Sequence, residues 1–190
     1  ILEKRVLLPS AILFLSVFSF GVVLTLVPDL SSHLGIQNKG LFFAIFTLSS
    51  LGIRLIAGRT SDRIGRVRVM RVASAVMVVA MISVAFASSK VMLLDGAVLF
   101  GAAVGMYSPT TTAWVVDRSL DKFRGRALAT MYIFLELGIG LGALVSSWLY
   151  NNKEENFQLA FLFSAGVAFL GFLILIFIKR DRKLEPLSVT

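Results

Sequence analysis

The chain has 190 residues, of which 57% are hydrophobic, and a formal net charge of +8. Soluble domains are only about 45–50% apolar, so this composition indicates a membrane protein and excludes an ordinary soluble domain. Nucleic-acid binding is disfavoured because the basic residues stand at the ends of apolar runs rather than on one water-soluble face. With no cysteine and a single histidine, His33, the chain is expected to hold no metal and no cofactor.

Six apolar runs are long enough to cross a hydrocarbon layer of about 30 Å, which takes about 20 helical residues. They cover residues 6–27, 40–57, 72–89, 92–116, 127–150 and 157–178. Backbone groups in lipid must satisfy one another, and the alternation of a barrel strand is absent, so each run should be a helix. The predicted fold class is an all-α membrane protein, a six-transmembrane-helix bundle forming one domain over residues 1–190.

Lys and Arg residues lie mostly on one side of the predicted bundle. Cytoplasmic loops carry the excess of these bases, and here 15 of the 19 fall near the chain ends or in the second and fourth connections. We therefore expect both termini in the cytoplasm and an inner-membrane location, with residues 29–39, 88–90 and 151–156 facing outward. The first residue is not Met, and the apolar run after it is too long for a signal peptide, so a longer polypeptide is expected.

The fourth run contains a proline among hydroxyl groups. Pro109 removes a hydrogen bond to the carbonyl of Gly105, so we expect a helix kink there. The polar residues around it are Tyr107, Ser108, Thr110, Thr111 and Thr112. A polar patch at membrane depth faces either neighbouring protein or a water-filled cavity, and the sequence leaves both open.

Two ionisable residues fall well inside predicted spans. Glu136 lies near the middle of the fifth and Arg54 in the inner third of the second. A charge at the bilayer centre costs about 2.5–3.5 kcal/mol or more, so each needs a partner, a water-filled path or neutralisation. Glu136 is predicted either to bind a proton or a cationic substrate group, or to form a fixed ion pair, with Arg54 as the obvious candidate.

The basic segment between the second and third runs carries a recognisable pattern. It reads Gly58, Asp62, Arg63, Gly65 and Arg66. This resembles the signature G-x-x-x-D-R-x-G-R-[RK] that joins the second and third helices in each half of a Major Facilitator Superfamily transporter, although Val67 replaces the usual base. The residues after the fourth run, Asp117-Arg118 to Arg124-Gly125-Arg126-Ala127, are similar to the companion loop of that family. The resemblance covers essentially the whole chain.

The resemblance implies that the chain is one six-helix half, and the charged tail favours the C-terminal half. A complete transporter packs two halves about an axis normal to the membrane and holds substrate near the midplane. The expected partners are a small-molecule substrate, protons, membrane lipids and a second half, from the same polypeptide or another copy. The resemblance also implies that the first and fourth helices line a cavity, with Phe14, Phe18, Thr25, Tyr107 and Thr111 as candidate substrate contacts.

The signature segment is interpreted as a latch on the inner side of the bundle. Arg66 can reach Asp117, and Asp62 can meet Arg118, Arg126 or the N-terminus of the fifth helix, where a carboxylate is stabilised. Several such contacts would bias the outward-open state. The alternative is an orientation signal that also binds anionic lipid, which accounts for the arginines but not for the aspartate among them.

Small residues spaced by four predict close helix packing. They are Ala97, Gly101 and Gly105 in the fourth run and Gly138 and Gly142 in the fifth. The run from Gly138 to Ala143 also looks somewhat like the glycine-rich fifth-helix signature of drug–proton antiporters, but it lacks the proline expected after the glycines.

These features together predict half of a gradient-driven secondary transporter that moves a small solute by alternating access, as an exporter or with proton coupling. A non-transporting membrane receptor or scaffold with the same bundle is the alternative. An enzyme is not expected, because no Ser-His-Asp, metal-ligand or phosphate-loop constellation occurs.

Overall fold

The computed structural model describes residues 2–178, and within them every long element is a helix. The six helices are α1 (Leu7–His33), α2 (Gly40–Ile64), α3 (Arg66–Ala85), α4 (Lys90–Arg118), α5 (Arg124–Tyr150) and α6 (Phe157–Phe177). Short 3-10 segments, η1 (Lys4–Val6), η2 (Asp121–Phe123) and η3 (Glu154–Asn156), precede α1, α5 and α6. All six helices are long and apolar enough to cross a membrane, so the predicted fold class is confirmed.

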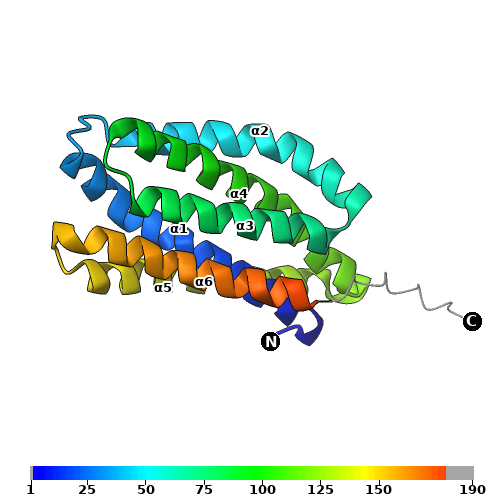
Figure 1. The fold of residues 1–190 in the computed structure, drawn as a ribbon. Coiled ribbons are helices and arrows are strands. Elements are labelled where there is room, and N and C mark those ends of the chain that lie inside the picture. The colour runs from blue at the N-terminus through cyan, green and yellow to red at the C-terminus, as the bar shows by residue number, and fades with distance from the viewer. Residues whose placement is uncertain (1, 179–190) are drawn as a thin grey trace, which may run out of the picture.

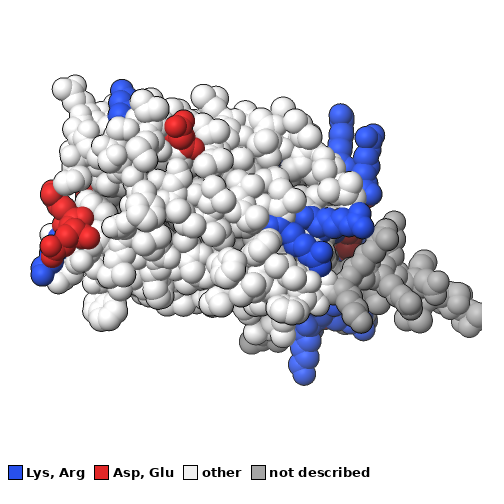
Figure 2. All heavy atoms as spheres, in the orientation of Figure 1, with Lys and Arg blue, Asp and Glu red and all other residues white. Residues whose placement is uncertain are grey.

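The helices run side by side along one bundle axis, with α2 and α5 on opposite sides (Figure 1). The closest neighbours are α1 with α5, α2 with α4, and α3 with both α4 and α6. The start of α1, the α2–α3 turn and the end of α6 lie at the same end of the bundle. Most of the visible Lys and Arg side chains gather at this end (Figure 2).

Burial is uneven among the helices. In the most apolar stretch of each helix, the share of residues buried inside the bundle is 61% for α1, 17% for α2 and 22% for α5. The central helix α1 therefore supplies much of the core, whereas α2 and α5 bury little of their apolar surface within these six helices.

The glycines spaced by four pack helix against helix, as predicted. A Cβ on Gly105 of α4 would lie 2.6 Å from the carbonyl oxygen of Ser50 on α2. A Cβ on Gly138 of α5 would lie 2.7 Å from the carbonyl oxygen of Phe14 on α1. Only glycine permits backbones to approach this closely without a clash.

The signature segment is helical, not a connector between spans. α2 continues to Ile64, past the expected end of its span at residue 57, and α3 begins at Arg66, before the expected start at residue 72. Gly65 alone joins them, with a φ of 100° that suits glycine. Hydropathy locates the apolar part of a helix, and these two helices extend beyond it into polar sequence.

Candidate gate and transport cavity

A cavity of about 430 Å³ lies between α1, α2, α4 and α5, with one residue from α3. It is lined by Leu13, Ser16, Val17, Phe20, Phe46, Thr47, Ser50, Leu51, Arg54, Met77, Val104, Tyr107, Ser108, Thr111, Thr112, Met131, Tyr132, Leu135 and Ile139. The lining is mainly apolar, with hydroxyl groups on α1, α2, α4 and α5 and a single charged side chain, Arg54. Such a surface suits a small amphipathic molecule, since apolar walls bury its body and a few polar groups orient it.

Two of the five predicted substrate contacts line this cavity. Tyr107 is 3% exposed, and its hydroxyl contacts Ser74 Oγ on α3. Thr111 is also buried and donates to Met70 Sδ at 3.4 Å. Four of the five polar residues around Pro109 therefore face a cavity, all except Thr110, although the hydroxyls of Tyr107, Thr111 and Thr112 also bond within the bundle.

The three predicted contacts on α1 are not among the residues that line this cavity, and their contact with substrate stays a prediction. Phe14 meets Phe134 edge to face at 6.5 Å. Phe18 is buried near Phe163, with ring centroids 6.1 Å apart. Thr25 donates to the carbonyl of Gly21 on its own helix at 2.9 Å.

The cavity face of α1 is formed instead by Leu13, Ser16, Val17 and Phe20. These positions follow the i, i+3, i+4, i+7 spacing of one helix face. Sequence reasoning missed the face because α1 is apolar all round, so no polar stripe distinguishes the cavity from lipid or core. Ser16 alone was not a sufficient signal, because Ser19 and Thr25 are also polar residues at membrane depth in α1 and do not line the cavity.

Pro109 lies inside a helix that continues through it, since α4 runs unbroken from Lys90 to Arg118. The adjacent Thr110 hydroxyl is buried without a hydrogen-bond partner in the described residues. Thr112 donates to the carbonyl of Ser108 at 3.0 Å, across the same turn. The kink itself stays a prediction.

Glu136 and Arg54 do not form the ion pair that was one of the two predictions. Both side chains are exposed, and no ion pair within residues 2–178 includes either of them. Arg54 lines the cavity from α2, whereas Glu136 lies in a separate hollow on the surface of α5. The reason is topological, because α2 and α5 stand on opposite sides of the bundle.

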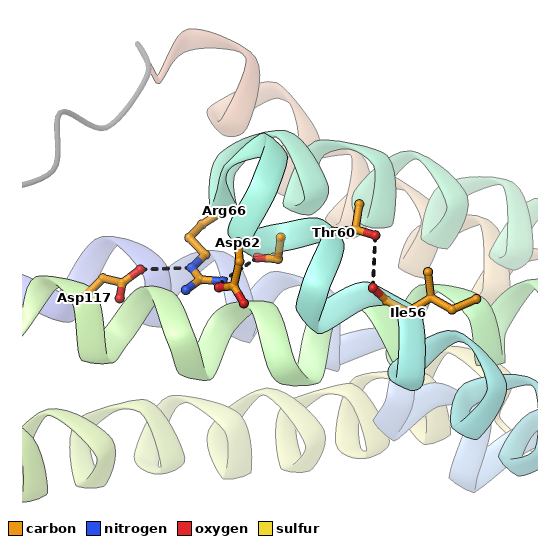
Figure 3. Close-up of polar contacts among 6 residues, drawn as sticks. Ile56, Thr60, Asp62, Arg66 and Asp117 are labelled. Atoms are coloured by element: carbon orange, nitrogen blue, oxygen red, sulfur yellow. Dashed lines mark hydrogen bonds and ion pairs between the residues drawn. The ribbon is translucent and has the colours of Figure 1, made fainter.

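The end of the bundle that carries the α2–α3 turn holds a cluster of side chains centred on Arg66 (Figure 3). This first residue of α3 pairs with Asp62 of α2 at 2.5 Å and with Asp117 of α4 at 2.9 Å. It also donates to the hydroxyl of Ser61 at 3.0 Å. The predicted contact between Arg66 and Asp117 is therefore present. The guanidinium of Arg66 joins the ends of α2, α3 and α4.

The other residues of the predicted latch lie around this cluster. Arg118 Nε donates to the carbonyl of Arg5, at 3.2 Å, which ties α4 to the segment before α1. Arg126 lies over the ring of Phe123, 4.9 Å from its centroid. The Arg63 side chain is exposed, and a Cβ added to Gly58 would meet no atom within 4 Å. Sequence reasoning missed Ser61 and the pairing of Asp62 with Arg66 one turn away.

Comparison with known proteins agrees with this architecture. The family model described as Major Facilitator Superfamily matches residues 10–189. The chain is similar to "Multidrug resistance protein 1" of Bacillus subtilis (strain 168), with 26% identity over 92% of this chain and 44% of the relative. It is also similar to the "Multi-drug resistance efflux pump PmrA homolog" of Lactococcus lactis subsp. lactis (strain IL1403), with 31% identity over 68% of this chain and 34% of the relative.

Among solved structures, the crystal structure of the peptide transporter POT in complex with sulfate has a similar fold. The TM-score is 0.76, with 21% identity, over 92% of this chain and 37% of that one. The chain therefore spans less than half the length of the relatives and of the solved structure that it matches.

Proposed function

Because the chain belongs to the Major Facilitator Superfamily, we propose that it forms one half of a gradient-driven secondary transporter that exports a small solute by alternating access. The observation that carries this proposal is the cavity between α1, α2, α4 and α5, which is flanked by α2 and α5, the two helices that bury the smallest share of their apolar stretch within the bundle. A second six-helix half would cover it and complete a substrate site near the membrane midplane.

The substrate class follows from the lining of the cavity. Phe20, Phe46 and Tyr132 offer aromatic surface, and the hydroxyls of Ser50 and Thr112 lie among them. This mixture suits small amphipathic organic molecules better than sugars or inorganic ions, because most of the lining surface is apolar and cannot replace a full hydration shell. The names of two relatives, which refer to multidrug resistance and efflux, support the same class.

The Arg66 cluster is proposed to work within this half rather than as a bond that breaks during transport. Arg66 ties α2, α3 and α4 together, so their inner ends move as one unit. That unit would carry the α2–α3 turn against the second half when the inner side closes and withdraw it when the inner side opens.

The orientation is proposed from charge. The basic end of the bundle faces the cytoplasm, since cytoplasmic loops carry the excess of Lys and Arg. The segment before α1 and the end of α6 then lie on that side of a cell membrane.

The test is a transport assay with the assembled transporter in proteoliposomes. A proton gradient is imposed, and the movement of cationic, neutral and anionic fluorescent dyes is followed. Gradient-dependent dye movement that an uncoupler abolishes is expected. A correctly inserted transporter that moves none of the dyes, under proton or sodium gradients, would instead support the receptor or scaffold alternative.

A further inference from the structure

Two charged side chains at membrane depth are left without ion-pair partners by this bundle. Arg54 on α2 and Glu136 on α5 are both exposed, and no ion pair in the described residues includes them. Lipid cannot satisfy such groups, and intramembrane charges almost always face protein or water and pair with one another. Each of these groups therefore needs either water or a charged partner from outside these six helices.

The two charges lie at closely similar depths. Arg54 comes ten residues before Ile64, the last residue of α2, and Glu136 comes twelve residues after Arg124, the first residue of α5. At 1.5 Å per residue these intervals are about 15 and 18 Å. Both helix ends are at the same end of the bundle (Figure 1), so the basic and the acidic group lie near one level.

A glycine one helical turn after each charge leaves open space beside it, which we call a glycine notch. Gly58 follows Arg54 by four residues and Gly140 follows Glu136 by four, so each glycine lies on the same helix face as its charge. A Cβ built on either glycine meets no atom within 4 Å. The glycines that pack within the bundle behave differently, since a Cβ on Gly105 would lie 2.6 Å from a carbonyl oxygen. Gly58 and Gly140 therefore leave room for a backbone that is not part of these six helices.

The two charges lie at or next to the cavity. Arg54 lines it directly, and Tyr132 lines both the cavity and the hollow that holds Glu136. The rest of that hollow is apolar apart from Glu136, being formed by Ala, Ile, Leu and Gly residues of α5. Glu136 is thus placed to contact a helix that lies along α5 beside the cavity and is not one of these six.

We propose that Arg54 and Glu136 form two ion pairs with the second half, Arg54 with a carboxylate and Glu136 with a base, each on a helix that packs into the adjacent glycine notch. This rests on the proposed function only in that a second half is present. If that half is related to this one by a two-fold axis along the membrane normal, its fifth helix faces α2 and its second helix faces α5. Groups of opposite charge then meet at one depth.

The depth of these pairs distinguishes them from the Arg66 cluster. When two halves rock against each other, displacement grows with distance from the pivot, and a substrate site near the midplane implies a pivot there. Pairs that lie nearer the midplane than the Arg66 cluster can persist in both states and hold the halves together. Contacts between the halves at the inner end, near Asp62, must separate.

The experiment measures assembly of the transporter after charge reversal. Arg54→Glu and Glu136→Lys are compared with Asp95→Lys, which reverses an exposed charge near the outer end of α4. Membrane insertion is measured by a C-terminal fluorescent fusion and assembly by size-exclusion chromatography after mild heating. Each of the first two changes is expected to lower the assembled fraction at least about tenfold, because a broken pair leaves an uncompensated charge, whereas Asp95→Lys should assemble normally.

Suppressor mutations then identify the partner. Changes that restore assembly to Arg54→Glu should create a base on the facing helix of the second half, and those for Glu136→Lys should create an acid. If the second half is another copy of this chain, co-expression of the Arg54→Glu and Glu136→Lys chains should restore assembly where neither does alone. Normal assembly of both single variants would overturn the proposal, and dye transport by these variants would show that the proposed function survives it.

Discussion

Arg66 contacts three side chains through one guanidinium, and the two carboxylates it pairs with are more than half exposed. Exposed ion pairs each contribute about 0–1 kcal/mol, so the cluster cannot dominate the stability of the bundle. The cluster instead fixes the positions of the helix ends relative to one another, since Arg presents several donors in a fixed plane and can hold two acceptors at once.

The first prediction concerns Asp62, which is paired with Arg66 but has its side chain 64% exposed. Asp62→Asn keeps the shape and removes the charge that would meet the second half. We expect dye transport to fall at least about tenfold, while the free energy of unfolding changes by less than about 1 kcal/mol. Transport in proteoliposomes and thermal unfolding in detergent measure the two effects.

Asp121→Asn is the matched control, because Asp121 is an exposed acid at the same end, paired with Arg124 at 2.8 Å. It should transport normally. Equal loss of membrane insertion and transport in Asp62→Asn would favour the orientation-signal interpretation instead.

Among the elements, α6 ends on a cap supplied by another helix. Arg71 of α3 donates from Nε to the carbonyl of Leu175 at 2.8 Å, and from Nη2 to the carbonyls of Ile176 and Ile178 at 3.3 and 2.8 Å. The last carbonyls of a helix lack intrahelical partners, and a cation at this end also interacts favourably with the helix dipole. Arg71 therefore fixes the C-terminal end of α6 to α3.

The second prediction is that Arg71→Ala loosens the last turn of α6. A helix-end cation contributes about 0.3–1 kcal/mol, and up to about 2 kcal/mol when partly buried, so amide exchange in the peptide ending at Phe177 should accelerate by up to about tenfold. Hydrogen–deuterium exchange with mass spectrometry measures this. Arg68→Ala, an exposed arginine one turn earlier, should leave that peptide unchanged. Faster exchange in both variants would contradict a specific cap.

How far these elements could be predicted depended on whether they carried a periodic signal. The six helices were predictable because a helix that crosses lipid needs a long apolar run. The packing glycines were predictable because closely packed helices need small residues at a fixed spacing. The face of α1 that lines the cavity was not, because apolar residues suit lipid, core and cavity wall alike. The pairing of Glu136 with Arg54 failed for another reason, since sequence shows depth in the membrane but not which helices are neighbours.

At the scale of the whole molecule, charge separates the two ends of the bundle, and most visible Lys and Arg side chains lie at the end of the α2–α3 turn (Figure 2). A membrane-spanning bundle with this asymmetry should insert in one orientation. The same end carries Arg66 and its partners, so the Arg66 cluster lies among the arginines that set the orientation. Orientation therefore has to be measured separately from transport.

The last prediction uses the absence of cysteine from the sequence. A single cysteine replaces Lys153, between α5 and α6, or Lys122, between α4 and α5, both of which are exposed. A membrane-impermeant maleimide should label Lys153→Cys in intact cells, but Lys122→Cys only after the membrane is permeabilised. Equal total labelling after permeabilisation controls for expression. The reverse pattern would place the Arg66 cluster outside the cell, and the gate would then close the outer mouth of the cavity rather than the inner one.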